Sequence, residues 1–254
     1  WLLFVAALVF AMVVLGGATR LTQSGLSMTD WRPVTGVLPP LGQAAWEAEF
    51  ERYKQYPEYR KVNLGMNLAE FKVIFWFEYA HRLLGRLIGL AFFVPFFWFL
   101  FRRRLGPGMA LKLAGVFLLG GFQGLVGWWM VKSGLVDHPD VSHYRLATHL
   151  ALALLILAAL LWLAWGILLP VAAEGVSSGL VRLAGLVVVL VFVQALTGAL
   201  VAGLDAGRQF NTFPSMDGAW FPDELWQLLP WWLNLFENPT TVQFDHRIGA
   251  YLVL

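Results

Sequence analysis

Residues 77–89 read Phe-Glu-Tyr-Ala-His-Arg-Leu-Leu-Gly-Arg-Leu-Ile-Gly, and this stretch decides how the rest of the chain is interpreted. It places a carboxylate (Glu78), an imidazole (His81) and two guanidinium groups at the start of a long apolar run. Charged groups at the end of a membrane span are costly unless they are paired or functional. Nearly the same pattern returns as Gln243-Phe244-Asp245-His246-Arg247 before a second apolar run. The two copies indicate an internal repeat that holds the same kind of group twice.

The composition is typical of an integral membrane protein, because 59% of the 254 residues are hydrophobic and only 13% are charged. A net charge of +2, without a groove-sized basic patch, argues against binding to nucleic acid. The chain has no cysteine, which excludes disulfides and thiolate metal sites. A metal would therefore be held by histidine or carboxylate, or arrive inside a cofactor. Both ends of the sequence lie within apolar runs, and we interpret the sequence as truncated at both ends.

A membrane-spanning helix needs roughly 20 mostly apolar residues. Arg102, Arg103 and Arg104, together with Lys112, make the second connection basic, which places it in the cytoplasm by the positive-inside rule. The two long connections then lie on the outer side of the membrane. The predicted spans are 1–18, 73–101, 109–131, 146–169, 180–204 and 242 onward.

With this topology His81, His149 and His246 all lie at the outer ends of even-numbered spans, while the odd-numbered spans share glycine-rich ends. The sequence therefore predicts an all-α integral membrane protein of two pseudo-repeated four-helix bundles. Eight helices are expected, of which about six are present here. The predicted domains are 1–170, with outer loop 19–72, and 171–254, with outer loop 205–241. The second bundle would need two further helices and a fourth histidine.

Both long loops contain segments suited to the membrane surface. Residues 43–56 predict a short amphipathic helix with Trp46, Phe50 and Tyr53 at helical spacing. Residues 225–236 are too short and too interrupted by proline to span, and their three Trp suit the membrane interface. Each segment either anchors its loop or forms a lid over a cofactor pocket.

Helix bundles bind cofactors between inward-facing side chains, and a haem iron can be held by two imidazoles from facing helices. His81 and His149 would supply such a pair in the first bundle, and His246 one ligand in the second. The alternative role for each histidine is a structural hydrogen bond between helices. Small residues near these histidines fit a flat macrocycle, or else serve close helix packing.

The arginine after each of two histidines has a corresponding role. Arg82 and Arg247 lie where haem propionates would emerge, and a guanidinium binds a carboxylate in a two-pronged fork. Alternatively both extend to lipid headgroups. We predict that His138 and His143 are solvent-side loop residues and do not bind metal.

The two halves differ at one informative position. Glu78 lies three residues before His81, whereas Gln243 lies three residues before His246. A carboxylate on the face of the histidine can transfer protons and an amide cannot. We infer that the first half carries out chemistry and that the second half holds a permanent electron-transfer haem. The alternative is that Glu78 only pairs with Arg82 at i+4.

Together these motifs closely resemble the haem A synthase family, in its cysteine-free mitochondrial and proteobacterial branch. The matching stretches span the whole chain and are Gly16-Gly17-Ala18-Thr19-Arg20-Leu21-Thr22, Ser24-Gly25-Leu26-Ser27-Met28 with Trp31, Glu78-Tyr79-x-His81-Arg82, Tyr144-Arg145-Leu146-Ala147-Thr148-His149, Asn211-Thr212-Phe213-Pro214-x-Met216, and Asn238-Pro239-Thr240-x-x-Gln243-Phe244-x-His246-Arg247.

The resemblance implies an eight-helix membrane enzyme that oxidises the C8 methyl of haem O to a formyl group, through hydroxylated intermediates, to give haem A for cytochrome oxidase. It implies that His81 and His149 lie in the substrate-haem half with Glu78 as the important acid. It also implies that His246 is one iron ligand of a haem b, the other being a histidine beyond residue 254.

The family further implies a bacterial cytoplasmic or mitochondrial inner membrane, with the haem sites toward the periplasm or intermembrane space. Membrane lipid, haem O synthase and cytochrome oxidase assembly factors are the expected partners. Two other functions remain open, a di-haem b-type electron-transfer cytochrome and a haem carrier.

Overall fold

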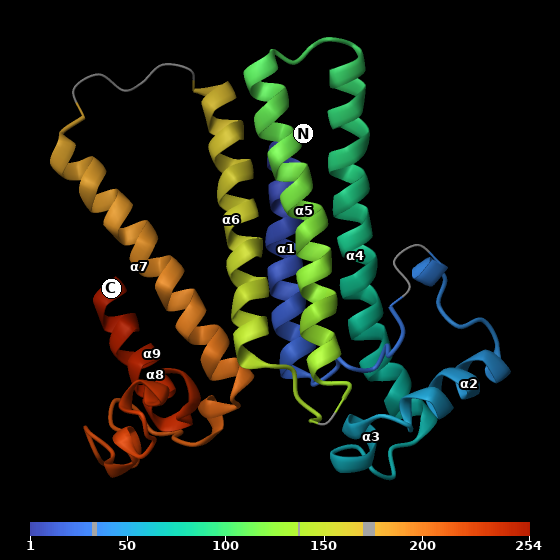
Figure 1. Cartoon of the computed structure of the whole chain (residues 1–254), viewed down its shortest axis with the longest axis vertical. Helices are drawn as coiled ribbons and strands as arrows, with labels where there is room; N and C mark the ends of the chain where they lie inside the picture. The colour runs from blue at the N-terminus through green and yellow to red at the C-terminus, as the bar shows by residue number, and fades with distance from the viewer. Residues whose placement is uncertain (32–34, 137, 170–175) are drawn as a thin grey trace. The chain divides into compact units, whose positions relative to one another are not determined.

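The fold is helical throughout the residues that the computed structural model describes, 1–31, 35–136, 138–169 and 176–254 (Figure 1). No strand occurs in these ranges. The long helices are α1 (Leu2–Leu21), α4 (Leu68–Phe101), α5 (Pro107–Ser133), α6 (His143–Leu168), α7 (Ser178–Gly203) and α9 (Pro239–Val253). The short helices are η1 (Thr35–Val37), α2 (Gln43–Tyr53), α3 (Pro57–Lys61), η2 (Ala206–Arg208), η3 (Asp223–Trp226), η4 (Trp231–Leu233) and α8 (Asn234–Glu237).

Five of these helices, α1 and α4 to α7, are long and apolar enough to cross a membrane. The prediction of an all-α integral membrane protein is thereby confirmed. The sixth predicted span begins at α9, whose 15 residues are fewer than the roughly 20 that a span needs. The prediction that this segment spans the membrane stays a prediction.

Helix α4 begins five residues before its predicted start at residue 73. The reason is a capping box, in which the Asn67 side chain accepts hydrogen bonds from the backbone N–H of Ala69 and Glu70, at 2.8 and 3.0 Å. In return the Glu70 carboxylate accepts the N–H of Asn67 at 2.8 Å. With 34 residues the helix is about 51 Å long, more than the roughly 30 Å of a bilayer core. One end of α4 therefore extends beyond the hydrocarbon.

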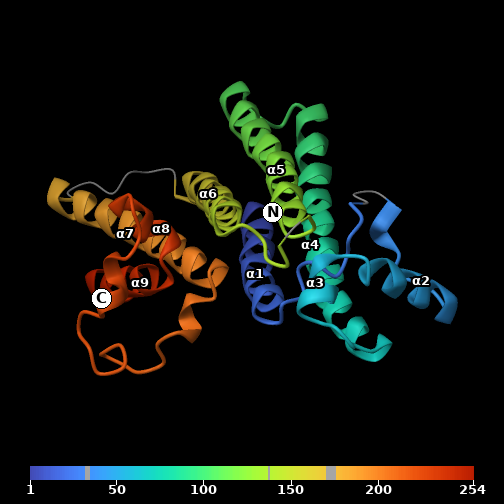
Figure 2. The ribbon, with the colours of Figure 1, turned by 60° about the horizontal axis from the view of Figure 1, so that its bottom comes forward.

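The amphipathic helix predicted at 43–56 is confirmed as α2, and it packs against α4 (Figure 2). Trp46, Phe50 and Tyr53 are buried together with aromatic residues of the first turns of α4, among them Phe71 and Phe75. These contacts anchor the outer loop on the helix that carries His81. No contact tests a role as a lid.

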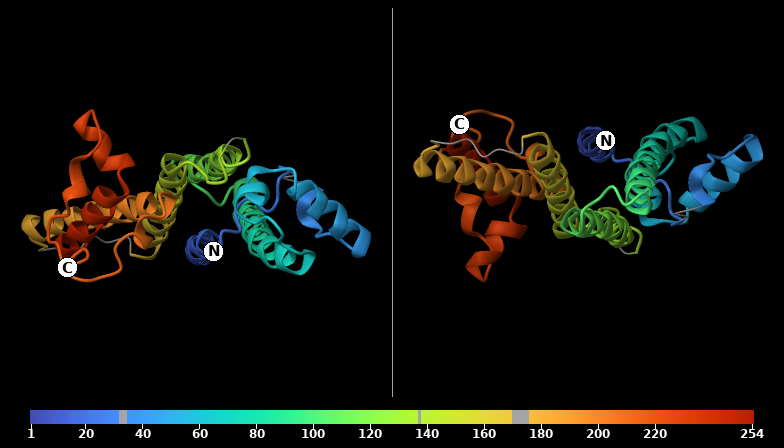
Figure 3. Two further views of the ribbon diagram at one scale, coloured as in Figure 1. Left: turned by 90° about the horizontal axis from the view of Figure 1, so that it is seen from below. Right: turned by 90° about the horizontal axis from the view of Figure 1, so that it is seen from above.

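The chain divides into two compact units, and each is described by itself. The first comprises Trp1–Val141 and Leu152–Pro170. In it α1 packs along α4, α5 lies against α4, and the later part of α6 completes one apolar core (Figure 3). The core is formed by Leu2, Val5, Ala6, Val9, Phe92, Phe96, Leu113, Val116, Ile156, Leu160, Leu163 and Ala164.

The second unit comprises Ser142–Ala151 and Val171–Leu254, and its main feature is the packing of α7 along α9. The segment predicted to lie at the membrane interface, 225–236, forms η3, η4 and α8, with Trp226, Trp231 and Trp232 exposed. The start of α6 belongs to this unit, whereas the predicted first domain extends to residue 170. The division into two four-helix bundles stays a prediction.

Candidate functional site

In the first unit the imidazole of His81, on α4, lies against a glycine of α1. A Cβ atom at Gly16 would lie 3.3 Å from His81 Nε2 and 3.7 Å from Cδ2. The missing side chain therefore lets the ring pack closely against α1. Within the described part of the chain, no residue forms a hydrogen bond with this ring. The ring is thus placed by packing alone.

In the second unit His246, on α9, lies against a glycine of α7 in the same manner. A Cβ atom at Gly198 would lie 3.0 Å from His246 Cε1 and 3.6 Å from Nε2. Here the ring is also hydrogen-bonded, because Nδ1 lies 2.8 Å from Thr197 Oγ1 and 3.0 Å from Gln194 Nε2. The Gln194 amide also donates to the His246 backbone carbonyl at 2.8 Å. The two histidines therefore share the glycine contact and differ in their hydrogen bonds.

His149 is partly buried near the start of α6. It belongs to the second unit, whereas His81 belongs to the first. Since each unit is described by itself, the predicted pairing of these two residues as iron ligands stays a prediction.

The carboxylate of Glu78 is 3% exposed and accepts four hydrogen bonds. Oε1 accepts from Arg82 Nε at 3.0 Å and Nη2 at 2.7 Å. Oε2 accepts from Ser27 Oγ and from the backbone N–H of Met28, both at 2.7 Å. The i+4 pair of Glu78 and Arg82 is therefore present, and it is part of a larger connection. These contacts hold the loop that follows α1, which favours a positioning role for Glu78.

Arg82 extends this connection to the loop that follows α1. Its Nη1 donates to the carbonyl of Asp30 at 2.9 Å and its Nη2 to the carbonyl of Met28 at 2.7 Å. Together with Glu78, these contacts use four of the five guanidinium N–H groups. We call this arrangement the first loop clamp; it ties residues 27–30 to α4 one turn from His81.

The second unit contains a second loop clamp of the same design. Gln243 Nε2 and Arg247 Nη2 both donate to the carbonyl of Phe210, each at 2.9 Å. Arg247 Nη1 donates to the carbonyls of Thr212 and Ser215 at 2.9 and 3.2 Å. An i, i+4 pair beside the histidine thus holds the loop that follows α7. Arg247 keeps two N–H groups beyond these contacts with described residues, against one for Arg82.

Two other histidines were predicted to be loop residues. His138 is exposed in the connection before α6, as expected. His143 is instead the first residue of α6, so its assignment to a loop was wrong. Its Nε2 lies 3.6 Å from Glu237 Oε2, and the Tyr144 hydroxyl donates to Glu237 Oε1 at 2.7 Å. These contacts tie α6 to α8 and give His143 a structural role.

A buried acid in the outer loop has no counterpart in the predictions. Glu58, in α3, is 5% exposed and accepts a 2.9 Å hydrogen bond from the Tyr53 hydroxyl, which in turn accepts one from Asn63 at 2.8 Å. Burial raises the pKa of Glu58 to about 8, the nearby charges of Glu78 and Asp140 raise it further, and the Tyr53 hydrogen bond opposes the rise. Nothing in its sequence neighbourhood distinguishes Glu58 from the exposed acids of α2.

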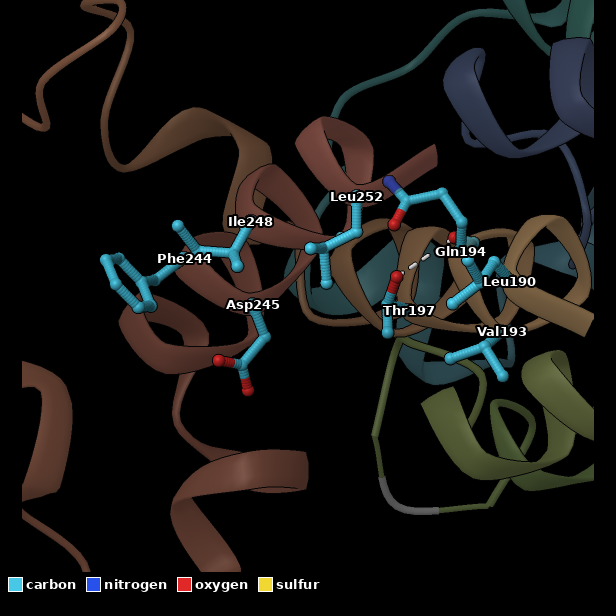
Figure 4. Close-up of a pocket in the computed structure, with 9 residues that line it drawn as sticks. Leu190, Val193, Gln194, Thr197, Phe244, Asp245, Ile248 and Leu252 are labelled. Carbon is cyan, nitrogen blue, oxygen red and sulfur yellow. Dashed lines mark hydrogen bonds between the residues drawn. The ribbon is translucent and has the colours of Figure 1, made fainter. Parts of the chain in front are cut away.

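A pocket of about 210 Å³ lies between α7 and α9, and Figure 4 shows the residues that line it. Gln194 and Thr197, which contact His246, line it from α7, and Asp245 lines it from α9. The remaining lining residues are apolar: Leu190, Val193, Phe244, Ile248, Gly249 and Leu252.

The sequence alone did not identify Ser27, Gln194 or Thr197 as site residues. The Gln194–Gly198 stretch belongs to one of the glycine-rich ends of the odd-numbered spans. Its two polar residues within an otherwise apolar span were an available signal, because polar groups in a membrane helix need partners.

Residues 1–254 match the COX15-CtaA family, described as cytochrome oxidase assembly protein. A "Heme A synthase" of Nitrosospira multiformis is 55% identical over 254 residues, which cover 99% of this chain and 71% of that relative. Proteins of the same description from Nitrosomonas eutropha and Parvibaculum lavamentivorans are 53% and 54% identical over 100% of this chain, covering 72% and 74% of their own lengths. No solved structure matches the chain.

Proposed function

The chain belongs to the cytochrome oxidase assembly protein family, and from that premise we propose that it is a haem A synthase, an integral membrane enzyme that converts haem O to haem A. In this reaction the C8 methyl of the substrate becomes a formyl group. The substrate haem would be bound by His81 and His149. His246 would be one ligand of a resident haem b.

The observation that carries the proposal is the repeated contact between a histidine and a glycine. Gly16 lies against Nε2 and Cδ2 of His81, and Gly198 lies against Cε1 of His246, each on the helix that packs beside the histidine. Histidine binds iron through a ring nitrogen. A side chain at either glycine would push the imidazole away from its position, so both glycines preserve the placement of a candidate ligand. These contacts support haem binding at both histidines.

The difference between the rings supports one exchangeable and one resident haem. His81 forms no hydrogen bond with a described residue, whereas Thr197 lies 2.8 Å from Nδ1 of His246 and Gln194 donates to the His246 backbone carbonyl. Fixed ligand orientation favours permanent binding, because contacts to the second ring nitrogen strengthen metal affinity. A substrate haem must leave after conversion, so a looser ligand suits it. When bound at His246, haem b would supply electron transfer.

The clamps give Glu78, Arg82 and Arg247 defined tasks in this proposal. Each clamp ties the loop that follows the glycine-bearing helix to the helix that carries the histidine. The guanidinium N–H groups beyond these contacts are available to haem propionates. Glu78 would act as a positioning group for the substrate half, and its predicted role in proton transfer stays a prediction.

The proposed membrane is the bacterial cytoplasmic or mitochondrial inner membrane. The basic connection at Arg102–Arg104 would face the cytoplasm or matrix, and the clamped loops the opposite side. Haem O synthase and cytochrome oxidase assembly factors are the proposed partners.

Extraction and chromatography of the haems in the purified full chain test this function. We expect haem B together with haem O, or with its hydroxylated or formyl products. His246→Ala should remove haem B, and His81→Ala should remove the substrate and its products. Haem B alone, in a membrane rich in haem O, would instead support a di-haem electron carrier. Bound haem O that is never oxidised would support a carrier.

A further inference from the structure

We propose that Thr197 is a positioning residue that selects the tautomer of His246 able to bind iron. In this role it prevents Gln194 from donating a hydrogen bond to the same ring nitrogen, Nδ1. The inference rests on the proposed function, in which His246 is a haem ligand. It assigns a task to two α7 residues whose side chains, within the described part of the chain, make polar contacts with each other's residue and with His246.

The direction of the hydrogen bonds determines the tautomer. Thr197 Oγ1 donates its one proton to the Gln194 backbone carbonyl at 2.9 Å, the bond drawn in Figure 4. Its oxygen is then free only to accept, and the atom placed to donate is His246 Nδ1, 2.8 Å away. In the proposed arrangement the ring proton lies on Nδ1. Nε2 keeps its lone pair for iron, because a neutral imidazole carries one N–H.

Gln194 favours the opposite tautomer. Its amide nitrogen lies 2.8 Å from the His246 carbonyl, so it must be the nitrogen and not the oxygen that faces this acceptor. The same nitrogen lies 3.0 Å from Nδ1. Without the Thr197 hydroxyl, a Gln194 N–H would donate to Nδ1 and the ring proton would move to Nε2. That proton would block iron ligation.

Packing keeps these groups in place. A Cβ atom at Gly198 would lie 3.0 Å from His246 Cε1, and one at Gly249 would lie 2.2 Å from Gln194 Oε1. The ring and the amide therefore each pack closely against a helix backbone that carries no side chain at that point.

The first unit lacks this arrangement. Counted from the glycine that faces each histidine, Thr197 corresponds to Leu15 and Gln194 to Met12. Neither residue can hydrogen-bond to a ring nitrogen as an amide or a hydroxyl does. Tautomer selection is therefore specific to the half proposed to hold its haem permanently.

The test replaces Thr197 in the full chain and measures the haem that depends on His246. Thr197→Val keeps the shape and removes the hydroxyl, and the haem affinity should fall about 10–100-fold, as is typical when a group behind a metal ligand is lost. The midpoint potential of the remaining haem should rise, because an Nδ1–H donating to an acceptor makes the imidazole more basic and favours ferric iron. Thr197→Ser should behave as wild type.

A double variant separates tautomer selection from packing. Gln194→Met removes the competing donor. It introduces the residue type that α1 has at the corresponding position, Met12. Thr197→Val with Gln194→Met should regain part of the haem affinity lost in Thr197→Val alone. A structural role would make the double variant weaker than either single one.

Thr19→Val is the matched control, since its hydroxyl donates only to a carbonyl of its own helix at 2.8 Å. If Thr197→Val leaves both affinity and potential unchanged, or if the double variant binds less haem than both single variants, the inference is wrong and the proposed function stands. If His246→Ala leaves haem B in place, the proposed function fails and the inference fails with it. Should Thr197→Val not fold, Gln194→Met alone decides: tautomer selection predicts unchanged or tighter haem binding, and weaker binding refutes it.

Discussion

Replacing Gly198 with alanine should disturb the ligand position at His246 with little effect elsewhere. The new methyl group would lie 3.0 Å from Cε1 and 3.6 Å from Nε2, so the ring would have to move by a few tenths of an ångström. It cannot move freely, because Thr197 holds Nδ1 at 2.8 Å and Gln194 holds the backbone carbonyl at 2.8 Å. Overpacking of this kind typically costs about 1–3 kcal/mol.

Helix propensity works in the opposite direction, because alanine stabilises a helix by roughly 0.5–1 kcal/mol relative to glycine. The net penalty at Gly198 should therefore be about 1–2 kcal/mol, which corresponds to roughly a tenfold loss of haem affinity. The control is Gly185→Ala on the same helix, where no atom lies within 4 Å of the added Cβ. That variant should bind haem as wild type does.

The same comparison can be made in the first unit, where Gly16 and Gly17 are neighbours. A Cβ atom at Gly16 would lie 3.3 Å from His81 Nε2, and one at Gly17 would have no atom within 4 Å. Gly16→Ala should have a smaller effect than Gly198→Ala, because the His81 ring can tilt. The assay is haem content by extraction, together with thermal unfolding in detergent. Equal haem content in Gly198→Ala and Gly185→Ala would refute the glycine-contact reasoning.

Two further predictions concern the clamp and the outer loop. Glu78→Gln and Arg82→Met should each lower haem A formation, and in a double-mutant cycle their effects should be strongly non-additive, with the double variant close to either single one. Additive losses would show that Glu78 acts independently of the clamp. For the outer loop, burial raises the pKa of Glu58 from 4.5 to about 8, so the folded loop binds a proton that the open loop releases. The contribution of Glu58 to the stability of the closed loop should be complete below pH 4.5. Between pH 4.5 and about 8, the equilibrium constant for loop closing should fall about tenfold for each pH unit. Protease cleavage within residues 43–66 should therefore increase over this range in wild type, and Glu58→Gln should abolish the dependence; the same slope in the variant would assign it to another group.

The spans could be predicted because hydropathy is a local property of the sequence. The apolar runs located α1 and α4 to α7 to within a few residues. The main error, at the start of α4, occurred where apolarity ends but the helix does not. Asn67 and Glu70 form the cap there. Their Asn-x-x-Glu spacing is typical of a helix start, but a prediction from hydropathy alone does not use it.

The contacts of the site could be predicted only in part, because most of their partners carry no sequence signal. The i+4 spacing of Glu78 and Arg82 indicated an ion pair. Arg82 also binds the backbone carbonyl of Met28. Every residue has such a carbonyl, so the sequence does not show which one Arg82 binds. Likewise, the approach of Gly16 to His81 depends on how α1 packs along α4, and spacing within one helix does not contain that information.

Under the proposed function, the repeat would let one scaffold hold two haems with different fates. Each half packs a histidine against a glycine and uses an i, i+4 pair to hold the adjoining loop, and these shared elements would set where a haem binds. Two of the differences are Glu78 against Gln243 and Leu15 against Thr197. The first changes the charge of the clamp, and the second decides whether the ligand ring is hydrogen-bonded. Exchanging Leu15 for threonine should therefore make the His81 haem harder to release, and slower product release in Leu15→Thr would place the control of exchange in this one contact.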